Sequence, residues 1–329
     1  MRAWTIPDQR GLGGLSLQTL PDPSPGPGEV VLRIHRAALN PADRYLAEGL
    51  YPARPSFPHV LGRDGAGVIA AVGPGVEGWR VGEPALVLRG AAGVDRPGTL
   101  AEALALPAAA LAKVPSGWSG AEAAGAALVL LTAHQALLQW GRLPPSTVLV
   151  SGAGGGVGAA TVQLAAALGH RVIGLSRSAA KRERLVTLGA AATFDPGGGS
   201  WRRDVKALLA PLRVDLVVDT IGGALFGELV DTLGFGGRVS VVGMLAGPVP
   251  AFNTASLFFR RIRLGGVAVG SDSAEEQRRA WEESVALLEA AGQRPEVDSE
   301  FPFEEVPAAF TRLAEGPMGK VIVRLPAAG

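Results

Sequence analysis

The sequence predicts an α/β protein of two domains, a β-rich amino-terminal region followed by a doubly wound parallel sheet. Short, continuously apolar segments alternate with helical segments from Thr147 to Gly243, whereas the segments before Ser119 show strand patterns and glycine turns. Apolar strands separated by helices form parallel sheets that are covered on both faces. The length of 329 residues also suits about two domains.

The amino-terminal region contains three segments that are typical of strands. Glu29–Ala37 partly alternates apolar with polar residues, Gly65–Gly75 is a short strand between glycine turns, and Ala85–Leu88 follows another turn. No long helical pattern occurs before Ala121. This region is therefore predicted to be rich in β-structure.

The alternating series begins after a predicted helix, Ser119–Gln139, for which Ser119 is a candidate cap. The predicted strands are Thr147–Ser151, Arg171–Leu175, Thr193–Phe194, Val214–Asp219 and Arg238–Gly243. The predicted helices between them are Val157–Leu168, Ala179–Leu188, Trp201–Leu209 and Ala224–Leu233. Two further helices and a last strand, which we expect to return to the first domain, are Ser273–Ala291, Val306–Glu315 and Lys320–Leu325.

The composition excludes several classes of protein. Apolar residues make up 47% of the chain and charged residues 19%, which excludes global disorder. The net charge of +1 does not indicate binding to nucleic acid or to an anionic membrane. The chain has no cysteine, so disulfides, thiolate nucleophiles and cysteine-based zinc sites are excluded. The longest apolar stretch, Ala123–Ala133, is much shorter than the about 20 residues that a membrane span needs. We therefore expect a cytoplasmic protein.

A glycine-rich loop follows the first strand of the alternating series. Gly152–Gly158 reads GAGGGVG, a variant of the G-x-G-x-x-G fingerprint with Ala153 in the first position. Small residues permit a tight turn, the approach of a pyrophosphate to the backbone, and close packing of helix on strand. The N–H groups at the start of the next helix then face the phosphates. We therefore predict a Rossmann-type dinucleotide site, with these contact residues: Gly154, Gly155, Gly156 and Val157.

The end of the second strand indicates which dinucleotide is bound. A site for NAD has an acidic residue there for the ribose 2′-hydroxyl. This chain has Ser176 and Arg177 instead, followed by Lys181 and Arg182. Hydroxyls and cations suit a 2′-phosphate, although a basic helix start on the surface would look the same. We therefore predict NADPH, held by Ser176, Arg177 and Lys181.

Seven segments, spread in order over nearly the whole chain, carry a family resemblance. They are Ala37–Asp43, Gly49–Pro52, Gly62–Val68, Gly98–Glu102, Ala153–Gly158, Val218–Gly223 and Gly316–Val323. With these motifs the sequence resembles the medium-chain dehydrogenases/reductases, in their zinc-free quinone oxidoreductase branch. The resemblance implies a GroES-like catalytic domain of residues 1–121 and 266–329, a Rossmann NADP(H)-binding domain of residues 122–265, an active site in the cleft, and a homodimer.

The motif after Gly62 departs from the zinc-dependent members of this superfamily. Those members have a His-Glu pair after this glycine and an early cysteine, whereas this chain has Arg63-Asp64 and no cysteine. A catalytic zinc needs about three convergent protein ligands, and His59 with Asp64 would supply two at best. We therefore expect no metal. The reduction of a quinone or enone needs no Lewis acid, because the conjugated carbonyl already makes the acceptor electrophilic.

The resemblance also implies roles for individual residues of the acceptor site. Asn40 is expected to hydrogen-bond the substrate carbonyl or the nicotinamide ribose, and Asp43 to fix the Asn40 loop. Tyr45 and Tyr51, the only tyrosines of the chain, are expected to wall the acceptor site, with a hydroxyl able to polarise a carbonyl or donate a proton. A packed loop that covers a core is the alternative for the tyrosines.

Further cofactor contacts are implied at a helix start and at the ends of strands. Thr132 matches the branch's cofactor-contact threonine. The remaining candidates, which sit at strand ends where doubly wound sheets bind ligands, are Thr220, Gly243 and Met244. The branch often has a tyrosine near the adenine where this chain has Pro196, and a late arginine where it has Gly316, so phosphate recognition would depend on Arg177 and Lys181.

These features together predict an NADPH-dependent oxidoreductase that transfers hydride to a quinone or other electron-poor conjugated carbonyl without zinc. An enoyl-thioester or alkenal reductase, or an enzyme like alcohol dehydrogenase, of the same superfamily would show the same motifs. A non-enzymatic NADPH-binding redox sensor is the alternative from another class. A small-molecule substrate is expected, and neither nucleic acid nor a membrane is expected as a partner.

Overall fold

A computed structural model describes residues 1–88 and 92–326 and divides the chain into two compact units. The first unit consists of Met1–Leu128, Ser273–Trp281 and Arg294–Gly329. The second consists of Val129–Asp272 and Glu282–Gln293. The sequence had placed the boundaries at 121/122 and 265/266, and it had not separated 282–293 from its neighbours.

The second unit is built on a six-stranded parallel sheet. Its strand order is β11-β10-β9-β12-β13-β14, and every pairing in it is parallel. The strands are β9 (Thr147–Val150), β10 (Arg171–Leu175), β11 (Ala192–Phe194), β12 (Val214–Asp219), β13 (Leu233–Val241) and β14 (Arg263–Gly266). This order reverses next to β9, which is the arrangement of a doubly wound dinucleotide-binding sheet, so the predicted fold class is confirmed.

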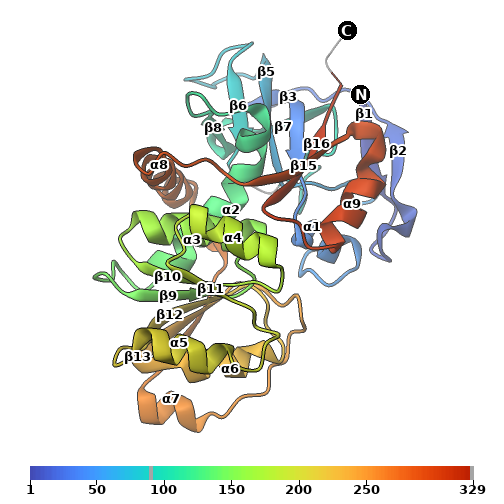
Figure 1. Cartoon of the computed structure of the whole chain (residues 1–329). Helices are drawn as coiled ribbons and strands as arrows, with labels where there is room; N and C mark the ends of the chain where they lie inside the picture. Colours follow the sequence, from blue (N-terminus) through green and yellow to red (C-terminus); the bar gives the residue numbers. More distant parts are fainter. Residues whose placement is uncertain (89–91, 327–329) are drawn as a thin grey trace. The chain divides into compact units, whose positions relative to one another are not determined.

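Helices cover both faces of this sheet, as predicted. The helices α3 and α4 lie on one face, and α5 and α6 on the other (Figure 1). Their bounds are α3 (Gly156–Ala167), α4 (Ala179–Thr187), α5 (Trp201–Leu209) and α6 (Leu225–Thr232). A core cluster between α5, α6 and the sheet includes Trp201, Phe226 and Val217, each at most 4% exposed.

The sequence missed two elements at the end of the sheet. The helix α7 (Ala255–Arg260) has six residues, too few to show a helical period. The strand β14 reads RLGG and is largely exposed, so it shows neither an apolar run nor an alternation. It occupies the edge of the sheet beyond β13.

The first unit is a β-rich domain with two sheets. Its larger sheet has the order β15-β16-β3-β5-β6-β8, with β7 also paired to β3, and its smaller sheet has the order β2-β1-β4. The strands are β1 (Arg2–Ile6), β2 (Ser16–Thr19), β3 (Glu29–Ala38), β4 (His59–Val60), β5 (Asp64–Val72), β6 (Pro84–Val87), β7 (Ala103–Pro107), β8 (Leu111–Lys113), β15 (Val297–Pro302) and β16 (Lys320–Arg324). The antiparallel pairing of β16 with β3 shows that the carboxyl-terminal strand returns to this domain, as predicted.

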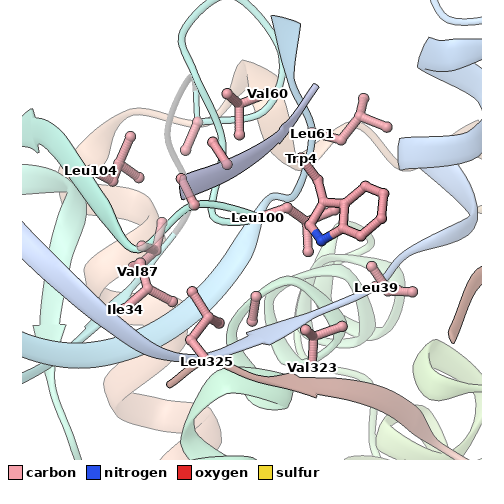
Figure 2. Close-up of a cluster of buried hydrophobic side chains, with 14 of the residues drawn as sticks. Trp4, Ile34, Leu39, Val60, Leu61, Val87, Leu100, Leu104, Val323 and Leu325 are labelled. Carbon is pink, nitrogen blue, oxygen red and sulfur yellow. The ribbon is translucent and has the colours of Figure 1, made fainter. Parts of the chain in front are cut away.

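The core of the first unit brings the two ends of the chain together. Trp4, Leu39 and Leu100 pack with Val323 in one cluster of buried side chains (Figure 2). The indole N–H of Trp4 donates to the carbonyl oxygen of Phe303 at 2.7 Å, so the one polar group of that side chain is satisfied within the core.

Two long helices, α2 (Gly120–Leu138) and α8 (Ala274–Ala290), each run through a boundary between the units. A capping box starts α2, because Ser119 N donates to the Glu122 carboxylate at 2.6 Å and Glu122 N donates to Ser119 Oγ at 3.2 Å. Within the described residues, α2 is the one helix long and apolar enough to cross a membrane by length and composition. Since 67% of its apolar window is buried inside the protein, packing in the core accounts for its apolar side chains.

Two shorter helices complete the first unit. They are α1 (Pro41–Ala47), which the sequence had not predicted as a helix, and α9 (Val306–Ala314).

Candidate active site

The glycine loop of the second unit connects β9 to α3 in a tight turn. Gly155 is the residue before the first helical turn, and its N–H donates to the carbonyl oxygen of Gly152 at 3.0 Å. A Cβ on Gly158 would lie 2.3 Å from that oxygen and 2.6 Å from the Cα of Ala153. Only glycine fits at position 158, because the first turn of α3 lies directly on the loop.

Gly155 is glycine for a different reason. A Cβ there would meet only the carbonyl oxygen of Gly152, at the ordinary contact distance of 3.5 Å, and the φ of −80° is open to any residue. Among the residues that the structure describes, no other atom lies close enough to require glycine there. The space suits a ligand that approaches the backbone, as the pyrophosphate of a dinucleotide does. The loop with the predicted Gly154, Gly156 and Val157 thus fits this part of the cofactor.

The ends of β9 and β12 are tied together by a buried carboxylate. Ser151 Oγ donates to Asp219 at 2.6 Å, and the N–H groups of Ile221 and Gly222 donate to the same carboxylate at 3.0–3.2 Å. The hydroxyl of Thr220, a predicted cofactor contact, donates to the carbonyl oxygen of Ser151 at 2.9 Å. Asp219 and Ser151 therefore hold the strand ends in place, a role that sequence reasoning missed.

The remaining strand-end candidates follow β13. Gly243 packs against Thr220, since a Cβ on it would lie 2.5 Å from the carbonyl oxygen of Thr220. Met244 is 37% exposed, which leaves its side chain accessible to a ligand. Thr132 lies in the part of α2 that belongs to the second unit and is 9% exposed. Their predicted cofactor contacts stay predictions.

The three cations after β10 differ in what they contact. Arg182 turns back onto the backbone, where Nη1 donates to the carbonyl oxygens of Ser176 and Arg177 at 2.8 and 3.0 Å. It also pairs with Asp195, 3.6 Å away, a carboxylate that the sequence reasoning did not consider. Arg177 is exposed, and Ser178 caps α4 by accepting from the backbone N–H of Lys181. Arg182 thus shapes the loop, and Arg177 remains the exposed cation beside it.

In the first unit, Asn40 and Asp43 form the start of α1. The backbone N–H of Asn40 donates to Asp43 Oδ2 at 2.8 Å, in a capping box that joins the two residues. This is the contact that the predicted positioning role of Asp43 requires. Burial raises the pKa of Asp43 above its ordinary value, and the nearby guanidinium of Arg63 opposes that rise.

The side chain of Asn40 belongs to a buried polar network. Its Nδ2 donates to Asp64 Oδ2 at 2.9 Å, and its Oδ1 accepts from Lys320 Nζ, which also lies 3.0 Å from Asp64 Oδ2. The second proton of Nδ2 is held only by a 3.4 Å contact to the carbonyl oxygen of Ala38. Asn40 is 4% exposed, so its oxygen is engaged and one amide proton is left weakly held.

Asp64 and Lys320 join the candidate site through Asn40, and the sequence reasoning did not assign them. Asp64 also accepts from the backbone N–H of Leu128 at 3.1 Å, so α2 and β5 meet at its carboxylate. Gly125 of α2 lets the helix approach Lys320, whose Cβ would lie 3.2 Å from a Cβ on that glycine. A lysine among the apolar residues of a predicted strand was the signal, since a buried ammonium group requires a partner.

Tyr51 and Tyr45 lie in one local structure with the buried guanidinium of Arg63. The N–H groups of Leu50 and Tyr51 both donate to the carbonyl oxygen of Tyr45, at 2.8 and 3.2 Å. The guanidinium carbon of Arg63 lies 4.2 Å from the centroid of the Tyr51 ring, and its Nε lies 3.4 Å from Asp43 Oδ1. Partial burial raises the pKa of Tyr45. The first unit thus brings Asn40, Asp43 and Tyr51 to one cluster together with Arg63 and Lys320, and the predicted roles of these residues at the acceptor stay predictions.

The described residues do not fit a zinc ion. Among them, no group of three or more histidine, cysteine, aspartate or glutamate side chains could hold a metal. The side chains beside Asp64 and Asp43 are instead the cations Lys320 and Arg63, which would repel a metal ion. Within residues 1–88 and 92–326, His59 is buried, its Nε2 has no hydrogen-bond partner, and it does not join a ligand set.

Comparison with known families agrees with this two-unit organisation. Residues 26–116 match the alcohol dehydrogenase GroES-like domain, and residues 156–290 match the family of zinc-binding dehydrogenases. A Rossmann-type unit together with a GroES-like unit defines a class of nicotinamide-dependent oxidoreductases. The chain belongs to the medium-chain dehydrogenase/reductase superfamily.

Two curated relatives and two solved structures illustrate the range of this family. The synaptic vesicle membrane protein VAT-1 homolog of Rattus norvegicus is 31% identical, over 95% of this chain and 82% of its own length, and the quinone oxidoreductase of Rattus norvegicus is 28% identical, over 99% and 98%. A crystal structure of an NAD-dependent alcohol dehydrogenase is 31% identical with a TM-score of 0.91, covering 99% of this chain and 100% of its own. A mycobacterial protein complexed with NADPH is 28% identical with a TM-score of 0.88, covering 98% and 100%.

Proposed function

We propose that this chain is an NADPH-dependent oxidoreductase that transfers hydride to a quinone or another electron-poor conjugated carbonyl without zinc. The observation that carries this proposal is the buried cluster of two pairs, Lys320 with Asp64 and Arg63 with Asp43. Lys320 and Arg63 supply fixed positive charges among the predicted acceptor-site residues, in a family that includes zinc enzymes. A conjugated acceptor suits such a site, because it accepts hydride without a metal-bound alkoxide.

The residues of the chain would bind and orient the reactants. The glycine loop before α3 and the exposed Arg177 would hold the pyrophosphate and the 2′-phosphate. When bound, NADPH supplies the hydride from its reduced nicotinamide ring. Asn40, with one weakly held amide proton, and Tyr51 would orient the carbonyl of the acceptor. The relative named quinone oxidoreductase supports the acceptor class.

The substrate class is tested by following NADPH oxidation against a panel of quinones, enones, enoyl thioesters and aldehydes, with and without a metal chelator. We expect turnover of quinones and enones that the chelator leaves intact. Faster reduction of enoyl thioesters than of any quinone would instead identify an enoyl-thioester reductase. Binding of NADPH without turnover of any acceptor would favour a redox sensor.

We expect NADPH to bind at least about tenfold more tightly than NADH, because a charge-assisted contact to the 2′-phosphate contributes roughly 1.5–3 kcal/mol. Arg177→Ala should remove most of that preference and leave NADH binding unchanged. Fluorescence titration of both cofactors measures it. Arg203→Ala, at an 80% exposed arginine of α5, serves as the matched control and should change neither affinity. Equal affinities for the two cofactors in the unaltered protein would contradict the NADPH assignment.

We also propose that the chain forms a homodimer through the edge strand β14. Among the described strands β14 pairs only with β13, so its other edge offers open N–H and C=O groups. Exposed aromatic side chains lie on α7 and β13 nearby, namely Phe258 (66%), Phe259 (74%) and Phe235 (74%). A second copy could pair with the same edge about a twofold axis and cover these rings.

Light scattering after gel filtration tests the dimer. We expect a mass of twice 33.6 kDa at micromolar concentration, because covering several exposed rings favours association. Phe259→Glu should shift the mass toward that of one chain, whereas Leu212→Glu, at a 64% exposed leucine before β12, should leave it unchanged. A single-chain mass for the unaltered protein would rule the dimer out.

The proposed setting is the cytoplasm, which the lack of cysteine supports.

A further inference from the structure

We propose that Arg63 is a catalytic residue whose guanidinium donates a hydrogen bond to the carbonyl oxygen of the acceptor as that oxygen gains negative charge. This inference deepens the proposed function and rests on it. Arg63 lies in the turn before β5, beside Tyr51 and Asp43. It would supply the positive charge that the reduction of a conjugated carbonyl can use.

The guanidinium of Arg63 is buried, and most of its donors have no hydrogen-bond partner among residues 1–88 and 92–326. The residue is 4% exposed, and an arginine carries five N–H donors. Nη2 donates to the carbonyl oxygen of Ala42 at 3.2 Å. Nε is buried and forms no hydrogen bond with the part of the chain that the structure describes, although it lies 3.4 Å from Asp43 Oδ1. A buried N–H group without a hydrogen bond raises the free energy of the folded protein. These donors can therefore bind an acceptor atom that a ligand would bring.

The neighbouring cation, Lys320, does not share this property. Its ammonium group contacts both Asn40 Oδ1 and Asp64 Oδ2, and those two groups also bond each other. Lys320 and Asp64 therefore satisfy one another within the network. Arg63 is the buried cation of this cluster with unbonded donors among the residues that the structure describes.

The backbone holds Arg63 in a fixed position. Gly62 has a φ of +99°, and a Cβ on it would lie 2.6 Å from Thr99 Oγ1. That hydroxyl donates to the carbonyl oxygen of Asp64 at 2.7 Å, and the N–H of Thr99 donates to the carbonyl oxygen of Gly62 at 2.9 Å, so the turn is bonded on both sides of Arg63. A donor held in this way needs no reorganisation when charge develops on the substrate.

Tyr51 places this donor at the predicted acceptor site. The ring of Tyr51 stacks under the guanidinium at 4.2 Å, and its hydroxyl has no hydrogen-bond partner among residues 1–88 and 92–326. A cation above a ring fixes the orientation of both groups. A phenol and a guanidinium, both with free donors, therefore lie together within one loop structure.

The step balances without a further reactant. The hydride of NADPH, with its electron pair, forms a C–H bond at the electrophilic carbon of the acceptor, and the π-bond electrons move onto the carbonyl oxygen. The nicotinamide is oxidised, and the acceptor becomes an enolate, which in the case of a quinone then tautomerises to a phenolate by moving the ring proton to oxygen. Arg63 keeps its proton throughout, because an arginine is not deprotonated in a protein. Water then supplies the proton that completes the product.

The other explanation for Arg63 is that it only neutralises Asp43. Three variants separate the two roles: Arg63→Gln, Arg63→Lys, and Arg63→Gln combined with Asp43→Asn. The double variant removes both charges and leaves no buried carboxylate unpaired. If Arg63 acts on the acceptor, the kcat of the double variant on an enone stays about 100-fold below that of the unaltered protein, because a donor to the developing oxyanion is lost. Arg63→Lys keeps the charge but not the planar guanidinium, so its kcat should fall less than that of Arg63→Gln.

A binding measurement separates this inference from the proposed function. By calorimetry, 4-nitrophenolate should bind the unaltered protein at least about tenfold more tightly than the double variant, whereas neutral nitrobenzene should bind both equally, because only the oxyanion uses the charge. The proposal is overturned if the double variant regains full turnover or binds 4-nitrophenolate unchanged. If no acceptor is reduced but 4-nitrophenolate binding still depends on Arg63, the oxyanion site stands and the proposed function fails.

Discussion

Replacing Lys320 by methionine should lower the free energy of unfolding by about 3–5 kcal/mol. The reason is Asp64, which is 2% exposed and would lose the ammonium group 3.0 Å away that pairs with its carboxylate in the core. Methionine is close to lysine in length, so the packing of the stem against α2 at Gly125 should change little. Urea unfolding followed by circular dichroism at neutral pH measures the loss.

The matched control adds Asp64→Asn to Lys320→Met. The amide in place of the carboxylate removes the buried charge and can still hydrogen-bond Asn40 and the Leu128 N–H. We expect this double variant to recover more than half of the stability lost by Lys320→Met alone. A single variant that costs less than about 1 kcal/mol would mean that solvent reaches Asp64 and that the network is not a buried ion pair.

The alternating half of the fold could be predicted from sequence because each strand there is a continuous apolar run. The strand β12 reads VDLVVD and was predicted with the bounds that the structure has, since both faces of a central parallel strand are buried. The edge strand β14 could not be predicted in the same way. It reads RLGG and is largely exposed, so its pairing with β13 is set by tertiary contact.

The acceptor-site cluster was predicted only in part, because its contacts are non-local. Asn40 and Asp43 are three residues apart, and their capping box is a local feature that a motif reveals. Lys320 reaches Asn40 across 280 positions of the chain, and no local pattern encodes that contact. Arg63 was noted only as a departure from the zinc pattern, and its contact with the Tyr51 ring required the folded structure.

The glycine loop provides the second large effect. Gly155→Ala should weaken NADPH binding by about 10–100-fold while changing the stability of the cofactor-free protein by less than about 0.5 kcal/mol. A Cβ at position 155 meets no protein atom closer than 3.5 Å, so the fold tolerates it, but the methyl group would occupy space that the pyrophosphate needs. Fluorescence titration with NADPH and thermal unfolding without cofactor measure the two quantities.

Gly158→Ala is the matched comparison, because it introduces the same methyl group one turn further along the loop. There the Cβ would lie 2.3 Å from a backbone oxygen and 2.6 Å from a backbone Cα, so the helix α3 must shift. We expect a loss of about 1–3 kcal/mol in the free energy of unfolding without cofactor, together with weakened NADPH binding. The pair separates a glycine required by the ligand from a glycine required by the fold. If Gly155→Ala destabilised the cofactor-free protein as much as Gly158→Ala, or bound NADPH normally, the loop would not approach the pyrophosphate at position 155.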